Sequence, residues 1–146
     1  MSLSTLGPML ACSLAFALSA PARAQLAPAP TEADLQAQGA AWVRGDDLAK
    51  LLNDATIDHT NLQSGQNVLM FYRADGTRFI KLGNGVRDTS WSIKDDLRCE
   101  KSVAGTGTVC QKIYRQADTY RICTVGEPTC YWLATFTPGD VAHLAR

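Results

Sequence analysis

The chain has 146 residues, of which 46% are hydrophobic and 19% charged, and its 14 basic residues balance its 14 acidic residues. The charges are spread evenly along the chain, whereas domains that bind nucleic acid or anionic membranes gather basic residues on one face. Composition therefore argues against both kinds of partner. The length suits one ordinary domain with its own core, which we expect to be a monomer.

The N-terminal region differs in composition from the rest of the chain. Residues 6–20 form an apolar run without charge, and a small-x-small site with Ala22 and Ala24 follows it. The run is shorter than the ~20 residues that a membrane-spanning helix requires. This pattern is typical of a secretory signal peptide over residues 1–24. We expect a mature protein that begins at Gln25, has no membrane anchor, and is periplasmic or secreted.

The predicted mature chain has two parts. Residues 25–45 are interpreted as an N-terminal extension and residues 46–146 as a β-barrel-like domain. Residues 25–30 contain two prolines and two alanines, and such a composition favours an extended tether.

A short helix is predicted at the start of the domain. Three leucines within residues 48–52 share one helical face. Asp46 or Asp47 is expected to cap the start of this helix, and Asn53 is expected to end it. Residues 33–41 are predicted to form another short turn of helix.

From residue 56 onward, the chain changes to short β-rich runs separated by turn residues. Strands are expected at residues 56–62, 68–73, 77–81, 89–93, 97–101, 109–114, 119–125, 129–136 and 141–144. The dipeptide Asp75-Gly76 is expected to supply the positive φ angles of a tight hairpin. Short connections force antiparallel neighbours, so we predict a mainly β fold: an antiparallel up-and-down meander of about eight strands forming a small barrel. A β-sandwich is the alternative.

Four cysteines follow the predicted signal, and an even number in an exported domain indicates two disulfides. If each turn is centred on its polar residues, Cys99 faces Cys110, Cys110 faces Cys123, and Cys123 faces Cys130. This spacing allows Cys99–Cys110 with Cys123–Cys130, or Cys110–Cys123 with Cys99–Cys130. We favour the first pairing, because each bridge then closes one hairpin. The chain has no Cys-x-x-Cys pair to indicate zinc.

A further cysteine, Cys12, lies inside the predicted signal and admits a lipoprotein alternative. Residues 9–11 make a poor lipobox, however, and would leave a very short apolar stretch before the lipidated cysteine. We therefore favour a cleaved signal without lipid.

The residues that could carry catalysis are few and scattered. His59 and His143 lie at opposite ends of the domain, and only barrel closure could bring them together. The paired acids at 46–47 and 95–96 are explained by helix-capping and turn preferences. No serine-hydrolase elbow or zinc-protease motif occurs. We assign no catalytic residue, metal ligand or cofactor.

Aromatic residues in the predicted strands are the main candidates for ligand contact. We predict that Trp91, Trp132 and Tyr131 lie at an exposed barrel rim and bind a ligand. The alternative is that the tryptophans belong to the core. That alternative is stronger for Trp91, because Trp91 and Ile93 alternate with serines. An eight-stranded barrel is either packed solid or holds one small ligand.

Four segments of the predicted β region carry short motifs: Phe71-Tyr72-x-x-Asp75-Gly76-Thr77, Trp91-Ser92-Ile93, Asp96-Leu97-Arg98-Cys99 and Cys110-x-x-Ile113-Tyr114-Arg115-x-x-Asp118-x-Tyr120. Together these segments resemble a family of small exported proteobacterial β-domain proteins of unknown function. The resemblance covers about residues 48–138 and implies a periplasmic β-barrel-like domain. It brings no catalytic residues. This chain departs from the family in its second cysteine pair and in residues 58–60.

Two hypotheses of function follow. The first is a module of the cell envelope that binds a small ligand or an envelope protein, without catalysis. The alternative is an envelope hydrolase or isomerase that uses His59, His143 and nearby carboxylates. We favour the first, because the second requires residues to be close in space that the sequence does not bring together.

Overall fold

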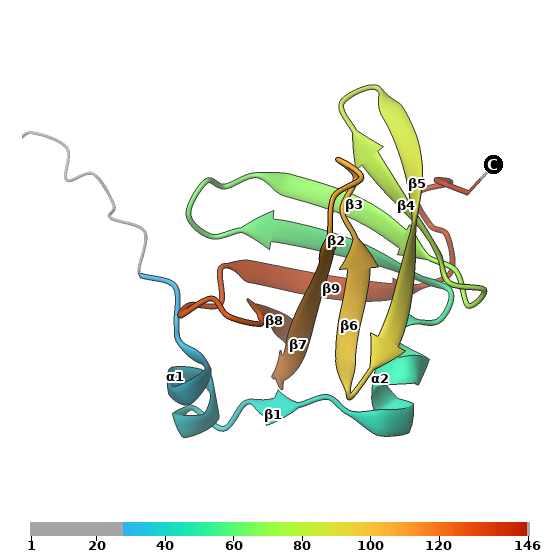
Figure 1. The fold of residues 1–146 in the computed structure, drawn as a ribbon. Helices are drawn as coiled ribbons and strands as arrows, with labels where there is room; N and C mark the ends of the chain where they lie inside the picture. Colours follow the sequence, from blue (N-terminus) through green and yellow to red (C-terminus); the bar gives the residue numbers. More distant parts are fainter. Residues whose placement is uncertain (1–27, 146) are drawn as a thin grey trace, which may run out of the picture.

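Eight antiparallel strands, β2 to β9, close into a barrel, and one extra strand and two short helices complete the fold (Figure 1). The computed structural model describes residues 28–145. Each barrel strand pairs with the next along the chain, and β9 pairs with β2 to close the ring. The predicted fold class is confirmed. The predicted signal peptide, residues 1–24, lies outside the described residues.

The elements follow one another in a simple order. They are α1 (Glu32–Ala37), β1 (Ala41–Trp42), α2 (Gly45–Leu52), β2 (Ala55–Asn61), β3 (Asn67–Tyr72), β4 (Thr77–Leu82), β5 (Gly85–Lys94), β6 (Leu97–Lys101), β7 (Thr108–Gln116), β8 (Thr119–Thr124) and β9 (Trp132–Pro138). No helix within residues 28–145 is long and apolar enough to cross a membrane.

Two turns set the register of the hairpins. Asp95 and Asp96, with φ angles of 52° and 60°, form the two-residue turn from β5 to β6. At the turn from β3 to β4, Gly76 has a φ of 87° and Asp75 does not share a positive φ. A Cβ at Gly76 would also lie 3.3 Å from the backbone oxygen of Trp91. Gly76 is thus required twice, for its backbone angle and for this close approach.

The predicted strand at residues 141–144 is wrong. The segment after β9 is a turn in which His143 has a φ of 51°. The Asp140 carboxylate accepts the backbone N–H groups of Leu144 and Ala145 at 2.8 and 2.7 Å. These bonds satisfy the local backbone, so the segment needs no neighbouring strand.

The helix α2 is confirmed, but its predicted cap is wrong. Arg44 is the N-cap and makes no side-chain capping bond, while Asp46 and Asp47 lie in the first turn. The Gly45 N–H instead donates to the carboxylate of Asp96, 2.8 Å away in the turn between β5 and β6. Asn53 ends the helix, as predicted.

The N-terminal segment packs on the outside of the barrel. α1 begins with a capping box between Thr31 and Asp34. Its buried Leu35 packs in a cluster with Tyr114 and the bridged Cys123 and Cys130. β1 pairs with β7. The described part of the predicted extension is therefore packed against the barrel.

The main core lies inside the barrel, and α2 closes one end. Leu48 and Leu52 of α2 are fully buried and join apolar side chains that point inward from the strands. The inward set includes Ile57, Ile113 and Ile122. The amphipathic pattern of α2 thus buries the leucine face that the sequence predicted.

The preferred disulfide pairing is confirmed. Cys99 and Cys110 are directly opposite on β6 and β7 and are bonded to each other. Cys123 is bonded to Cys130. Two of the expected facing positions are wrong. Cys123 is opposite Lys112 on β7 and not opposite Cys110, and Cys130 precedes β9 and so does not face Cys123 in a strand pair.

Peptide mapping without reduction tests this connectivity. We expect one linked pair that contains Cys99 and Cys110 and another that contains Cys123 and Cys130, because these sulfurs lie at bonding distance in the folded barrel. A matched map after reduction should release all four peptides. A peptide pair linking Cys110 to Cys123 would contradict the pairing, as would free thiols in the oxidised protein.

Candidate functional site

Trp91 is a core residue, so its predicted position at an exposed rim is wrong. Only 7% of its surface is exposed, and its indole N–H donates to the Arg73 carbonyl at 2.9 Å. Its ring meets that of Tyr72 edge-on at a centroid distance of 5.3 Å. The inward side of β5 accounts for this burial, as the alternation with serine indicated.

The other predicted contact residues lie around the start of β9. Trp132 is half-buried, and its ring centroid is 5.6 Å from that of His59 inside the barrel. Tyr131 is half-buried, and its carbonyl accepts the N–H of Leu62 at 2.8 Å. His143 is exposed in the C-terminal turn. The fold therefore brings Trp132 to His59 and leaves His143 on the outer surface.

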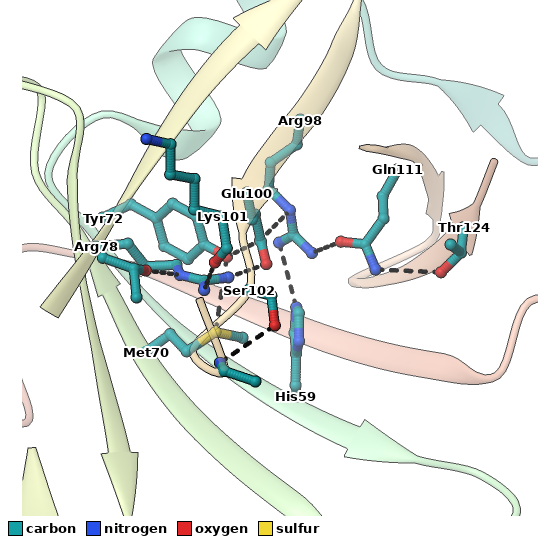
Figure 2. Close-up of polar contacts among 12 residues, drawn as sticks. His59, Met70, Tyr72, Arg78, Arg98, Glu100, Lys101, Ser102, Gln111 and Thr124 are labelled. Atoms are coloured by element: carbon teal, nitrogen blue, oxygen red, sulfur yellow. Dashed lines mark hydrogen bonds and ion pairs between the residues drawn. The ribbon is translucent and has the colours of Figure 1, made fainter. Parts of the chain in front are cut away.

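A carboxylate whose side chain is only 11% exposed is the centre of a polar network inside the barrel (Figure 2). Glu100 of β6 accepts hydrogen bonds from the guanidinium of Arg78 and the hydroxyl of Tyr72. The Nε of Arg98 forms an ion pair with the same carboxylate at 2.8 Å, without hydrogen-bond geometry. Arg78 also donates to the Lys101 carbonyl at 2.8 Å and to the Thr89 hydroxyl at 3.0 Å.

Arg98 extends the network across the barrel. Its side chain is fully buried, and its guanidinium carbon lies 5.3 Å from the Tyr72 ring centroid. One terminal nitrogen donates to the side-chain oxygen Oε1 of Gln111. The side-chain nitrogen Nε2 of Gln111 donates in turn to the Thr124 hydroxyl at 3.3 Å. The other terminal nitrogen is 3.3 Å from Nε2 of His59. A guanidinium only donates, so His59 accepts through Nε2 and carries its proton on Nδ1.

The charges in this network are unequal, because two guanidiniums share one carboxylate. Burial lowers the pKa of His59 well below its usual value, and the positive charges of Arg98 and Arg78 lower it further. Burial likewise raises the pKa of Tyr72. His59 and Tyr72 are therefore neutral at pH 7, and the interior carries a net charge of about +1.

This network is suited to holding strands together rather than to catalysis. It joins β2, β3, β4, β6, β7 and β8 through buried and partly buried contacts. His59 is 4% exposed and Arg98 is fully buried, so neither presents a reactive atom to solvent. The Glu100 carboxylate, 11% exposed, is also a poor general base, since each of its oxygens already accepts a hydrogen bond.

A pocket of about 430 Å³ lies between α2 and the hairpin of β7 and β8, and we call it the α2 pocket. Its apolar lining is half-buried and comes from Trp42, Val43, Leu51 and Tyr120. β1 positions this lining. Its pairing with β7 places Trp42 opposite Tyr114, and Val43 and Arg44 then lead directly into α2. The volume is within the range of small-molecule sites.

Exposed charged side chains surround the apolar lining of the α2 pocket. Arg44, Lys50 and Arg115 supply positive charge, and Asp47 supplies one carboxylate. Asp47 and Lys50 come from one face of α2, while Arg115 is opposite Ala41 in the sheet. The guanidinium carbon of Arg44 lies 4.9 Å from the centroid of the Trp42 ring.

The sequence interpretation missed both the network and the α2 pocket. A partial signal existed for the network: Arg98 and Glu100 alternate with Cys99 along β6, so their side chains share one face of the strand. The pocket depends on β1, whose two residues show no periodicity that could predict a strand. Its charged lining also resembles an ordinary solvated surface.

Comparisons with protein-family models, curated proteins and solved structures found no match for this chain. The resemblance to exported β-domain proteins therefore stays a prediction.

Replacing Glu100 tests the role of the buried carboxylate. Glu100→Gln keeps the size of the side chain but leaves two buried guanidiniums without a negative partner, so we expect a loss of about 3 to 5 kcal/mol in the free energy of unfolding. Urea denaturation at pH 7 measures it. The exposed Glu127 supplies the control, and Glu127→Gln should change stability by less than about 0.5 kcal/mol. Equal effects of the two variants would refute the assigned role.

Acidification tests the burial of neutral His59. The unfolded chain protonates this imidazole near pH 6.5, whereas the folded chain does so only at lower pH. The unfolded state thus binds more protons, and stability should fall as pH decreases below about 6.5, by up to about 1.4 kcal/mol per pH unit. Unfolding measured from pH 7.5 to 5 should show this slope.

Two histidine variants make that experiment specific. His59→Gln should flatten the slope, while His143→Gln, at the exposed histidine, should retain it. The assignment fails if the slope survives in His59→Gln.

Proposed function

We propose that this protein is a non-enzymatic binding module of the cell envelope that holds a small ligand in the α2 pocket. The observation that carries the proposal is a pocket of ligand size in which half-buried aromatic rings are surrounded by cations. Apolar surface with a few placed polar groups is typical of small-molecule sites. The envelope location is a proposal that follows from the predicted signal and agrees with the two disulfides.

The barrel supports binding better than catalysis. Its interior is occupied by the core and by the Glu100 network, so the ligand must bind outside it. The hydrolase or isomerase alternative required His59 and His143, but the first is buried and the second is exposed on the outer surface. Among residues 28–145, no group of three or more metal-ligating side chains comes together.

Another pocket of similar size supports the proposal less well. It measures about 450 Å³ and is lined by Phe79, Gly85, Val86, Asp88 and Leu144. It holds one aromatic ring and one carboxylate, without a cation to orient a ligand. The α2 pocket offers two rings and three cations, and thus more of the contacts that give specificity.

Chemical-shift mapping tests the location of the site. A mixed library of small aromatic and aliphatic fragments of either charge is titrated into the isotope-labelled protein, and we expect shifts around Trp42, Leu51 and Tyr120. Ala41→Trp should abolish them, because Ala41 is an exposed pocket residue and a large side chain there fills the space. Ala104→Trp, at an exposed loop position, is the matched control.

The outcomes separate this proposal from its rivals. Shifts confined to Trp132 and Tyr131 would favour the aromatic contact predicted from the sequence and overturn the α2 pocket. A protein that binds no fragment at either place would also overturn the proposal. Thermal unfolding of both tryptophan variants establishes that they remain folded.

A further inference from the structure

The α2 pocket carries a local excess of positive charge in a chain that has none overall. The whole chain has 14 basic and 14 acidic residues, whereas the pocket has three cations and one carboxylate. The carboxylate neutralises little, because Asp47 is 4.0 Å from Lys50 and both side chains are largely exposed. The field at the pocket therefore favours a negatively charged ligand.

The two arginines of the pocket are the strongest anion donors. Neither Arg44 nor Arg115 forms an ion pair with any residue among those described, 28–145. Each guanidinium presents a planar array of N–H donors, which matches the paired oxygens of a carboxylate or phosphate. Their usual partners inside a protein are acids, and here the donors remain available for a ligand.

The Trp42 ring helps to hold the Arg44 guanidinium in place. The Arg44 guanidinium lies over the Trp42 ring, and the Lys112 ammonium is 5.2 Å from the same ring centroid. Lys112 is also tied to Glu32 at 2.8 Å. Stacking of this kind limits the freedom of the guanidinium and lowers the entropy lost on binding. The half-buried ring of Tyr120 and side chain of Leu51 offer apolar surface beside it.

From these observations we infer that the α2 pocket selects a small organic anion that carries a carboxylate or phosphate group on a planar apolar body. This inference rests on the proposed function and adds the ligand class to it. Arg44 and Arg115 bind the anionic group, and Tyr120 and Leu51 contact the apolar body. Lys50 adds positive charge at the edge of the pocket.

Matched naphthyl probes test the ligand class. Naphthalene-2-carboxylate, 2-naphthyl phosphate and neutral 2-naphthylmethanol share one ring system and differ in charge. We expect at least one anion to bind about tenfold or more tightly than the alcohol, as followed by chemical-shift titration. Whichever anion binds more tightly identifies the head group. Raising the salt concentration should weaken anion binding and leave alcohol binding unchanged.

Charge variants assign the effect to the two arginines. Arg44→Gln and Arg115→Gln should each weaken anion binding by about tenfold without changing alcohol binding. Arg87→Gln, at an exposed arginine of β5, is the matched control and should change neither. Thermal unfolding of each variant verifies the fold.

The results distinguish the ligand class from the pocket itself. Equal binding of the alcohol and the anions in the α2 pocket overturns the anion inference and leaves the proposed function standing. Failure of both anions to bind also overturns the inference. The titration with the fragment library then still tests whether the α2 pocket binds a ligand. If the anions bind but Ala41→Trp does not weaken them, the pocket is not the site and both proposals fail.

Discussion

The burial of one carboxylate between two guanidiniums is the constraint on which the barrel interior depends. Glu100 can be buried only because Arg78, Arg98 and Tyr72 surround it, and the arginines are tolerated only because Glu100 is there. Tyr72 lies on β3 and Arg78 on β4, while Arg98 lies on β6 together with Glu100. Such a network penalises any shift in strand register, because a slip of one residue would turn these charges toward the wrong face. Apolar packing alone would specify the barrel less sharply.

The barrel interior and one end of the barrel have different roles. The interior is filled and holds the strands together, while α2 and β1 close one end and leave a pocket beside β7 and β8. Residues of the pocket are mostly exposed or half-buried. Its apolar residues Val43, Leu51 and Tyr120 pack against the core, whereas its charged residues are exposed. Substitution of the charged residues should disturb the core little, so the charge of the pocket can change without a loss of the fold.

Sequence patterns predicted the barrel well because its signals are local. Turn residues between short β-rich runs located six of the eight barrel strands closely. β5 begins at Gly85, well before its expected start at residue 89, and β9 was placed too early because Cys130 is held in the preceding loop by its bond to Cys123. The candidate site was predicted poorly. Inward charges such as Arg78 look like surface residues until their partners are known, and the α2 pocket joins positions that are far apart along the chain. Neither arrangement has a periodicity to detect.

The short strand β1 has a consequence for the behaviour of the protein in solution. β6 covers one edge of β7 only as far as Gln111, and β1 covers the same edge at Tyr114 and Arg115. Two residues thus complete the shielding of a strand edge whose backbone donors and acceptors could otherwise pair with another molecule. Loss of the segment before α2 would open this edge. A processed or truncated form would then tend to self-associate by intermolecular strand addition, even with every barrel strand intact.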